Sequence, residues 1–399
     1  MTVGHVMFFD PANYPPVINS CRVLAARGNH VEVLGYYRGL HRGFTAGDGI
    51  SEHYLNDPPG SFPRTMTEKL SAILRFRRAV ERWARVVKPS VIVAHDLHGF
   101  WGAATLLGRV PIVLHVHDMP NLDGGAGMGR LDRRILGRAI RQVPRAAALV
   151  MPEASRLRLA IEKWRFAGPA FVVANCPSLA APGRTTILRD LIRQRSGGTP
   201  EWIVVRAGGA GPVHLIDETV RAFRSLPDGC HLCLIGCGDE SYAVRLERLA
   251  LELGLTRRVH SFPYMCYDDL RAYLRSADIG VAIYRRYGGD INKELMGTGS
   301  AKHMEYVGVG IASVLSEQES FKILGDSTGA VVLRGESAEA IAECLLSLTR
   351  EPTLYRRLCD LAQKAHARRY HYEHQYAPIC TLIDALGERD PAADSVAPS

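Results

Sequence analysis

The 399-residue sequence predicts an α/β protein made of two Rossmann-like domains, each built on a parallel sheet. Short apolar stretches alternate with amphipathic helical stretches along both halves of the chain. Several apolar stretches, such as 112–116, lack polar alternation, which is typical of strands covered on both faces. The alternation lapses once, between 176 and 200. Because the chain is also about two to three times the usual domain length, we expect two domains.

The elements of the first half follow in order. An apolar strand over 5–9 precedes a helix over 16–27 whose apolar residues recur at helical spacing. A strand over 30–36 and a long helix over 68–87 come next. Further strands are expected over 90–94, 112–116, 146–151 and 171–174. Repeated strand–helix–strand units place parallel strands in one sheet with helices on both faces, so this domain is expected to span 1–175.

The second half repeats the pattern after a linker, expected over 176–200 because Pro, Gly and Ser flank a short basic helix there. The second domain is expected over 201–370. Its strands are predicted at 202–205, 230–235, 259–262, 279–283, 312–315 and 330–333, and its helices at 213–225, 242–253, 268–276, 300–308, 338–349 and 353–369. A C-terminal helix over 371–387 precedes a tail, 388–399, without periodicity, which we expect to be disordered.

Composition narrows the class of protein. Hydrophobic residues make up 47% and charged residues 23%, values typical of folded globular proteins. The 49 Lys and Arg against 41 Asp and Glu give a net charge of +8, which favours anionic partners. The apolar runs are far shorter than the ~20 residues of a membrane span, and no secretory leader is recognisable. We therefore expect a cytoplasmic protein, with membrane association on the cytoplasmic face as an open alternative.

The nine cysteines do not form a disulfide scaffold in a chain of this length. Cys230, Cys233 and Cys237 cluster, but strand alternation directs the first two to opposite faces, which favours structural cysteines over metal ligands.

Two stretches are strongly basic. Residues 75–88 contain six basic residues and one acid, and residues 130–145 contain six arginines, with apolar residues on the other side of each predicted helix. Such helices could dock on anionic lipid, or they could present a solvated face over an apolar core side. Nucleic acid is not an expected partner, because no recognised binding module or interleaving of aromatic and basic residues occurs.

Ligands of open parallel sheets bind beyond the carboxyl ends of the strands. In the first half the polar residues there are Asp10, 95–98 and 117–118. In the second half they are 206–211, 236–239, Pro263 and Tyr264, 284–290, and the glycine-rich turn 297–300 before a helix with Lys302 and Glu305. A glycine-rich turn that enters a helix presents amide N–H groups, which suit phosphate. The histidines suit proton transfer or substrate orientation, since imidazole titrates near neutrality.

Three common motifs are absent. The first strand–helix turn has no G-x-G-x-x-G, which excludes a dinucleotide-binding fingerprint there. The chain also lacks a P-loop run and the G-x-S-x-G of a hydrolase nucleophile elbow.

Six stretches carry a resemblance to a known family. The most specific is 300–314, SAKHMEYVGVGIASV, which is similar to P-x-K-x-x-E-Y-x-x-x-G-x-P-V-V. Shorter matches occur at 91–98, 112–118, 171–178, 207–211 and 372–373. Together they span most of the chain and resemble the retaining, nucleotide-sugar-dependent glycosyltransferases of family 4. The resemblance implies the GT-B fold, with two Rossmann-like domains facing a central cleft and a C-terminal helix that crosses back.

The resemblance also implies roles for particular residues. Glu305 would bind the ribose of the nucleotide, and the amides of the turn before it would hold the diphosphate. A basic pair after the first strand of the second domain usually neutralises the diphosphate. His117 would lie beside the point of sugar transfer.

The sequence departs from the family pattern at several positions. Gly297 stands where the family has the first glutamate of a Glu-x7-Glu pair, and Glu294 is close but out of register. His214, followed by Leu215, replaces a basic residue and a glycine, and Ala312 and Ser313 replace Pro-Val. Arg206 or Lys302 would supply the missing charge, because a guanidinium or ammonium group stabilises a departing phosphate. The alternative is a lower donor affinity or activity.

These considerations give the expected site. The catalytic residues are expected to be His117, Lys302 and Arg206. The donor is expected to bind Gly208, Gly209, His214, Gly236, Tyr264, Gly299, Ser300 and Glu305, and the acceptor Asp10, His95, Asp96 and Asp118. No metal or other cofactor is expected, because no Asp-x-Asp stands at a strand end and helix amides with cations can hold a diphosphate.

The expected reaction is glycosyl transfer from a nucleoside-diphosphate sugar, a UDP-sugar being favoured, to an acceptor hydroxyl with retention of configuration. Closure of the two halves would exclude water, which would otherwise hydrolyse the donor. The acceptor partner is a saccharide, a lipid-linked sugar or a small metabolite, in glycan or glycosylated-metabolite biosynthesis. Two rival interpretations stay open: a GT-B-like nucleotide-sugar epimerase, and a non-catalytic nucleotide-sugar-binding partner subunit.

Overall fold

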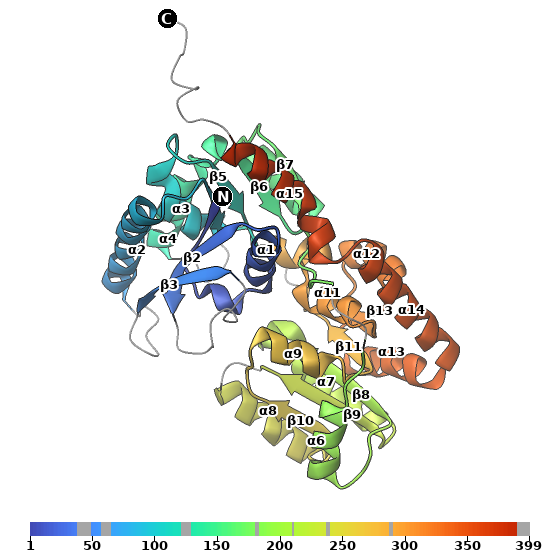
Figure 1. Ribbon diagram of the computed structural model, residues 1–399. Coiled ribbons are helices and arrows are strands. Elements are labelled where there is room, and N and C mark those ends of the chain that lie inside the picture. The colour runs from blue at the N-terminus through green and yellow to red at the C-terminus, as the bar shows by residue number, and fades with distance from the viewer. Residues whose placement is uncertain are drawn as a thin grey trace, which may run out of the picture. The chain divides into compact units, whose positions relative to one another are not determined.

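The computed structural model describes residues 1–37, 49–56, 65–120, 129–179, 183–209, 211–236, 240–286 and 290–388. The chain divides into two compact units (Figure 1). The first unit consists of Met1–Ala174 together with the C-terminal segment from Tyr372, and the second is Asn175–His371. Each unit is built around its own sheet, and each is described by itself below.

The first unit contains, in its described residues, a seven-stranded sheet in the order β3-β2-β1-β4-β5-β6-β7, with every neighbouring pair parallel. The strands are β1 (Thr2–Met7), β2 (His30–Tyr37), β3 (Ile50–Asn56), β4 (Val91–His95), β5 (Ile112–His115), β6 (Ala148–Met151) and β7 (Ala170–Val172). The sequence pattern did not predict β3. This strand lies at the edge of the sheet and is only half-buried, so it lacks the apolar run that marks a central strand.

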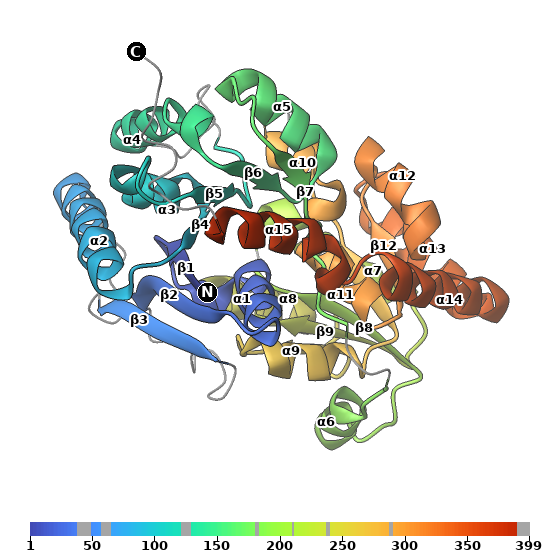
Figure 2. The same ribbon diagram turned by 45° about the horizontal axis from the view of Figure 1, so that its top comes forward.

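Helices cover both faces of this sheet (Figure 2). They are α1 (Pro15–Ala26), α2 (Met66–Val87), α3 (Asp96–Ala103), α4 (Arg130–Ile140), α5 (Ala154–Trp164) and α15 (Tyr372–Gly387). Thr65 and Glu68 start α2 with a capping box, in which each side chain accepts a bond from the backbone N–H of the other residue.

The C-terminal helix α15 belongs to the first unit although it follows the whole second unit in sequence (Figures 1 and 2). The Tyr372 hydroxyl donates to the Pro16 carbonyl at 2.9 Å, and Arg27 pairs with Asp384 at 2.8 Å. The helix therefore returns to α1, as the family resemblance implied.

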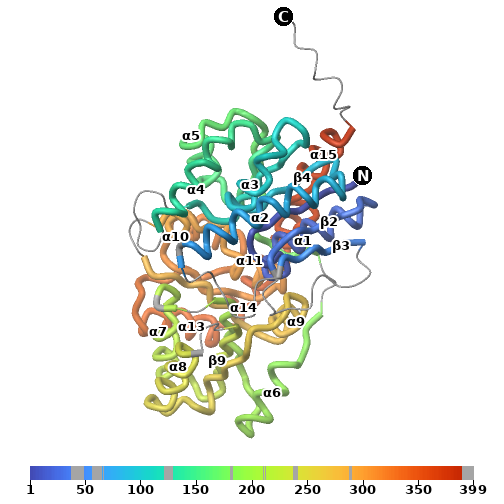
Figure 3. Tube along the Cα trace, turned by 90° about the vertical axis from the view of Figure 1, so that its left-hand side faces the viewer, coloured from blue at the N-terminus to red at the C-terminus, as the bar shows by residue number. Residues whose placement is uncertain are grey.

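The second unit contains a six-stranded parallel sheet in its described residues, in the order β10-β9-β8-β11-β12-β13. Its strands are β8 (Trp202–Ala207), β9 (Cys230–Ile235), β10 (Val259–Phe262), β11 (Ile279–Ala282), β12 (Ala312–Leu315) and β13 (Ala330–Val332). Its helices are α6 (Ile187–Ser196), α7 (Ile216–Ala222), α8 (Glu240–Glu252), α9 (Tyr267–Leu274), α10 (Ile291–Glu294), α11 (Ala301–Gly308), α12 (Glu319–Thr328), α13 (Ala338–Arg350) and α14 (Pro352–Arg368), and the trace of these elements can be followed in Figure 3.

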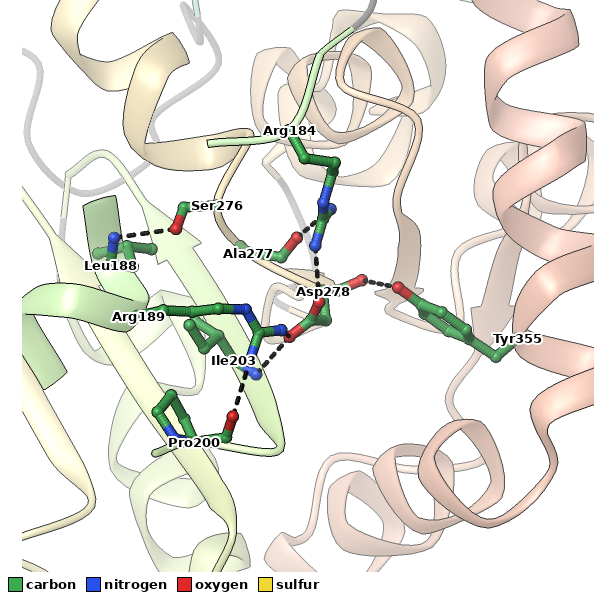
Figure 4. A network of polar contacts seen from close by, with 9 residues as sticks. All are labelled: Arg184, Leu188, Arg189, Pro200, Ile203, Ser276, Ala277, Asp278 and Tyr355. Carbon is green, nitrogen blue, oxygen red and sulfur yellow. Dashed lines mark hydrogen bonds and ion pairs between the residues drawn. The ribbon is translucent and has the colours of Figure 1, made fainter. Parts of the chain in front are cut away.

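The segment that the sequence marks as a linker is anchored to the second unit (Figure 4). Its short basic helix is α6. The buried Asp278 carboxylate accepts from Arg184 at 2.6 Å and from Arg189 at 2.7 Å. It also accepts the backbone N–H of Ile203 at 2.8 Å, and the Tyr355 hydroxyl donates to the Asp278 carbonyl at 3.2 Å. One carboxylate thus ties α6 to strand β8.

Both sheets change direction of strand order next to their first strand, between β1 and β4 and between β8 and β11. Ligands of doubly wound sheets bind at such switch points, beyond the carboxyl ends of the strands. Among the described residues no helix has both the length and the apolar character needed to cross a bilayer. Cys230 and Cys233 are buried and unbridged on β9, and Cys237 lies outside the described residues.

Candidate functional site

The second unit brings together residues from three separate loops and one helix at the carboxyl end of its sheet. Gly208 follows β8 at φ +86°, and Gly236 follows β9 at φ +70°. A Cβ on Gly236 would lie 3.6 Å from the Tyr264 ring and 3.9 Å from the Gly208 Cα. A Cβ on Gly208 would lie 3.5 Å from the Lys302 side chain. Three expected donor-site residues and the expected catalytic residue Lys302 are therefore neighbours, and the two glycines keep their surroundings open.

The Arg206 guanidinium binds the backbone of its own turn. Its side chain is buried, and its guanidinium donates to the carbonyls of Gly208 and Gly209. The arginine therefore holds the turn after β8 in shape while adding positive charge beneath it.

His214 lies within a cluster of positive charge. Burial, with a smaller effect of the charges on Lys302, Arg206 and Lys293, lowers the pKa of His214 to about 2, so its imidazole is neutral. The ammonium groups of Lys293 and Lys302 lie 5.3 and 5.5 Å from the centre of the Tyr284 ring. Lys293, on the short helix α10, was not predicted from sequence, because it follows the loop 284–290 rather than a strand. The cluster suits an anionic ligand.

The glycine-rich turn before α11 is held by its own hydrogen bonds. The amides of Gly299 and Ser300 donate to the carbonyls of Met296 and Gly297, and the Gly297 amide donates to the Ser320 hydroxyl. Ser300 caps α11, since its hydroxyl accepts the amide of His303 at 3.4 Å. Three of the amides that the sequence suggested for a diphosphate thus have protein acceptors, and the N-terminal end of α11 with Lys302 is the better place for an anion.

Glu305 is buried on α11 and keeps one carboxylate oxygen available. The Tyr267 hydroxyl donates to its Oε1 at 2.7 Å. Its Oε2 lies 3.8 Å from Arg271 Nε and has no hydrogen-bond partner among the described residues. Burial raises the pKa of Glu305, against the charge of Arg271 and the Tyr267 hydrogen bond. Tyr267 and Arg271 were not found from sequence, because they lie on α9, more than thirty residues before Glu305.

In the first unit the turn after β5 is held by two side chains from other elements. Asp96 Oδ1 accepts the backbone N–H of His117 at 2.8 Å. The buried Arg156 of α5 donates to the His117 carbonyl at 3.2 Å and pairs with the exposed Asp118 carboxylate at 3.4 Å. Arg156 was missed because an arginine in an amphipathic helix normally lies on the surface.

Asp10 has a structural contact, and Asp96 has an unusual backbone conformation. The buried Asp10 carboxylate accepts the Ala12 amide at 3.1 Å and so caps a short 3-10 helix, Pro11–Asn13. Asp96 has φ +55°, a left-handed conformation that is strained for aspartate, and burial raises the pKa of its carboxyl. Strain of this kind is often found at functional sites.

Four buried histidines form a cluster at the switch point of the first sheet. His95 pairs in register with Met7 and with His115, so His5, His95 and His115 point to one face. His117 follows on the same side and packs on His115 with ring centres 4.5 Å apart. Nitrogens of His95, His115 and His117 all lie within 4.8 Å of one another, which is the only grouping in the described residues that could hold a metal ion. His5, in the middle of the first strand, was not predicted as a site residue.

Comparison with family models covers most of both units. Residues 17–182 match the model described as Glycosyltransferase Family 4, and residues 204–351 match the model described as Glycosyl transferases group 1. The chain belongs to the family 4, group 1 glycosyltransferases. The family resemblance inferred from the sequence motifs is thus confirmed.

Solved structures show the same architecture as this glycosyltransferase. Sucrose-phosphate synthase from Thermosynechococcus elongatus matches with a TM-score of 0.73 at 15% identity, covering 97% of this chain and 99% of that one. Anabaena Alr3699/HepE in complex with UDP-glucose matches with a TM-score of 0.71 at 12% identity, covering 99% and 100%. A putative UDP-N-acetylglucosamine 2-epimerase from Listeria monocytogenes matches with a TM-score of 0.61 at 12% identity, covering 99% of each chain. No curated protein matches the sequence.

The predicted fold class is therefore confirmed: the glycosyltransferase has the GT-B architecture, with two Rossmann-like units on parallel sheets. The sequence identity to these solved structures is below 25%, so the matches establish the fold alone.

Proposed function

We propose that this glycosyltransferase moves a sugar from a nucleoside-diphosphate sugar, with UDP-sugar favoured, to an acceptor hydroxyl with retention of configuration. The observation that carries the proposal is the buried Oε2 of Glu305, which has no hydrogen-bond partner in the described residues. A buried carboxylate oxygen without a donor is costly, and a ribose diol supplies the missing O–H donors. The solved GT-B structures that contain UDP or UDP-glucose support the choice of base.

The cations around Tyr284 would receive the diphosphate. Lys302, at the start of α11, and Lys293 would neutralise its charge, and the helix N-terminus adds a favourable dipole. As the bond from the anomeric carbon to the diphosphate oxygen breaks, its electron pair stays on the diphosphate. Stabilising that charge lowers the barrier, because charge develops there in the transition state. We propose that these groups act without a metal ion.

The first unit would bind the acceptor. Asp96 and Arg156 hydrogen-bond to the backbone of His117 and so hold the turn that carries His117 and Asp118 in place without a ligand. We place His117 beside the transferred sugar or the incoming hydroxyl, and the exposed carboxylate of Asp118 among the acceptor contacts. A preorganised turn reduces the entropy lost on binding.

The test uses Glu305→Ala with Glu294→Ala as its matched control. Glu294 is exposed on α10 and is the glutamate nearest in sequence to the family position that Gly297 occupies. UDP binding is measured by titration calorimetry, and transfer by consumption of UDP-sugars with an acceptor panel. We expect Glu305→Ala to weaken UDP binding by about ten- to a hundred-fold, the value of a hydrogen bond to a charged group, and Glu294→Ala to leave it unchanged. Equal transfer by Glu305→Ala and the parent would contradict the assignment.

Two observations favour alternative functions for the same site. The match to a putative UDP-N-acetylglucosamine 2-epimerase raises donor isomerisation as a second activity of the same site. Incubation with donor alone separates the two, because an epimerase or hydrolase consumes donor without an acceptor. Gly297 and His214 stand in place of the family's glutamate and basic residue. They suggest a third function, that of a subunit that binds the donor without turning it over. Binding of UDP-sugar with no product from a broad acceptor panel would support that alternative.

We also propose that the basic helices of the first unit contact anionic membrane. Helices α2 and α4 both pack against α3 and lie on its two sides (Figure 2), and Lys69 of α2 pairs with Asp132 of α4 at 2.5 Å. Arginine is the most frequent exposed residue type on the two helices, and Leu70 and Leu74 of α2 are 40% and 44% exposed. The exposed arginines are Arg75, Arg78, Arg82 and Arg85 on α2, and Arg130, Arg133, Arg134 and Arg138 on α4. A basic surface with apolar side chains suits the headgroup region.

Vesicle flotation tests this contact. We expect binding to vesicles that contain phosphatidylglycerol, none to pure phosphatidylcholine, and release by salt. Reversal of Arg78 and Arg82 to glutamate should abolish flotation, whereas reversal of Arg356 and Arg357 on α14 should not. Flotation that is independent of lipid charge would refute the proposal.

A further inference from the structure

Three buried histidines, His95, His115 and His117, form a compact group that is here called the three-histidine site. One ring nitrogen of each residue lies within 4.8 Å of the other two, and His95 Nδ1 is 3.2 Å from His117 Nε2. The ring centres are 5.3 Å apart for His95 and His117, 4.5 Å for His115 and His117, and 5.5 Å for His95 and His115. Each ring therefore has the other two as neighbours.

These separations are close to those around a tetrahedral metal ion. With metal–nitrogen bonds of about 2.0–2.1 Å, two ligand nitrogens lie roughly 3.3 Å apart, and the centres of their rings lie roughly 5 Å apart. The pair His95 and His117 already has this spacing. Modest rotations of the rings would bring a nitrogen of His115 to the same distance, because it starts no more than 4.8 Å away.

His115 is the member of the group that hydrogen bonding leaves unsatisfied. Its side chain is fully buried, and neither of its ring nitrogens has a hydrogen-bond partner among the described residues. A buried polar atom without a partner is costly, so two such atoms on one ring indicate a ligand that contacts it. A metal ion at the centre of the group would take the lone pair of one of these nitrogens.

His95 has the outer-shell contact that is typical of a metal ligand. A metal-bound histidine usually donates its other ring N–H to a neighbouring acceptor, which fixes the orientation of the ring. With Nδ1 of His95 on the ion, its Nε2 carries the proton and donates to His5 Nδ1, 3.0 Å away. Because His5 is fully buried on β1, the sheet itself holds this contact in place.

The turn that carries His117 is fixed, and acidic groups outnumber basic ones on it. Asp96 accepts the backbone N–H of His117 at 2.8 Å, and Arg156 donates to the His117 carbonyl at 3.2 Å. Arg156 also pairs with the carboxylate of Asp118. Two carboxylates against one guanidinium favour a cation beside this turn.

We infer that the three-histidine site binds one divalent transition-metal ion of the zinc class, through one ring nitrogen each of His95, His115 and His117. His5 is then a positioning residue that orients His95. Imidazole suits zinc, cobalt, nickel and copper, whereas magnesium and calcium take oxygen ligands. Three protein ligands leave the fourth tetrahedral position to water or another oxygen ligand. The inference goes beyond the proposed function and does not rest on it, and the ion is separate from the groups proposed to bind the diphosphate.

Hydrogen bonds alone are the competing explanation. In that case His5, His95 and His117 form a row in which each ring bonds to the next, with buried water on the remaining nitrogens. Such a row leaves out His115 and has no affinity for metal. Titration with metal therefore separates the two explanations.

The primary test uses the full-length protein, prepared without a histidine tag and treated with a chelator. We expect it to bind one equivalent of Co²⁺ with the visible absorption of a tetrahedral nitrogen site, and Zn²⁺ to displace the Co²⁺. Zn²⁺ at about a hundred times its dissociation constant should raise the melting temperature by roughly 5–10 °C, because it binds the folded chain. Mg²⁺ should do neither. Absence of stoichiometric binding of Co²⁺ and Zn²⁺ would overturn the inference.

Three substitutions locate the ion. His115→Phe removes a ligand and should weaken Zn²⁺ binding by about a hundredfold or more. His5→Phe keeps all three ligands and should weaken binding about ten- to a hundredfold while the stoichiometry stays at one. His231→Phe is the matched control, because His231 pairs only with His260 in the second unit, and it should change neither affinity nor stoichiometry.

The same variants reveal binding elsewhere on the protein. If His115→Phe binds Zn²⁺ as tightly as the parent does, the ion is adventitious and the inference is wrong. Should His115→Phe not fold, X-ray absorption of the parent loaded with Zn²⁺ counts the imidazole ligands, and fewer than three would contradict the site. No sugar nucleotide is present in these experiments, so their outcome is independent of the glycosyl-transfer proposal.

Discussion

Replacement of Asp278 should release helix α6 from the second unit. The Asp278 carboxylate is 8% exposed and accepts three hydrogen bonds, from Arg184, Arg189 and the Ile203 backbone (Figure 4). In Asp278→Ala all three are lost, and the buried Ile203 N–H is left without its acceptor. In Asp278→Asn the charge is lost, while a carbonyl oxygen of the same reach can still accept from Ile203.

The magnitude follows from the exposure of each partner. A fully buried hydrogen bond to a charged group contributes about 1.5–3 kcal/mol, and an exposed ion pair about 0–1 kcal/mol. Arg184 is 48% exposed and Arg189 28%, so solvent screening leaves roughly 0.5 and 1 kcal/mol for them. An orphaned buried N–H costs about 1–3 kcal/mol. We expect about 3 kcal/mol for Asp278→Ala and about 1.5 kcal/mol for Asp278→Asn.

Hydrogen exchange of the α6 backbone amides measures the loss of stability at α6 itself. A local measurement is needed because a chain of two units need not unfold in one step. Loss of about 3 kcal/mol corresponds to roughly a hundred-fold faster exchange of the α6 amides where exchange occurs by opening. Asp228→Ala is the control, since Asp228 is fully exposed in its pair with Arg258 at 3.3 Å. If Asp278→Ala changes α6 exchange no more than Asp228→Ala, the buried carboxylate does not anchor α6 and the reasoning is refuted.

Three further predictions concern the donor site, the backbone and the acceptor turn. Burial raises the pKa of Glu305, so its carboxylate forms as the pH rises through that raised value. UDP affinity, measured by calorimetry, should increase over the same pH range. The Glu305→Gln variant lacks this titration and should not show the increase. If the difference in UDP affinity between the parent and Glu305→Gln were the same at every pH from 4.5 to 8, the ribose contact would be contradicted. Gly329→Ala should destabilise the protein by about 2–4 kcal/mol in urea unfolding, because Gly329 has φ +74° and a Cβ would lie 2.0 Å from a backbone carbonyl of α14. Gly28→Ala, at φ +84° with no atom within 4 Å, should cost only about 1 kcal/mol, and equal losses would mean that the contact with α14 is unimportant. Arg156→Met should lower transfer about tenfold at unchanged UDP affinity, because it frees the turn after β5; a loss of UDP binding instead would show a general folding defect.

Much of the fold could be predicted from the sequence because buried parallel strands are continuous apolar runs. The strand predicted over 90–94 from such a run is β4, Val91–His95. The edge strand β3 was missed since one-sided burial leaves it with mixed residues. The helix around Glu305 was predicted correctly, because a helix depends on residues within a few turns of one another.

The site was predictable only in part. The sequence alone determined two Rossmann-like halves, the family, and the candidate positions Glu305, Lys302 and His117. Only the tertiary structure decided what each side chain contacts. Arg156 of α5 donates to the carbonyl of His117, Tyr267 of α9 donates to Glu305 of α11, and His5 of β1 pairs with His95 of β4. The physical reason is range. Periodicity and capping are set by neighbours along the chain, whereas these contacts join residues as much as ninety positions apart, which become neighbours only when the sheet assembles.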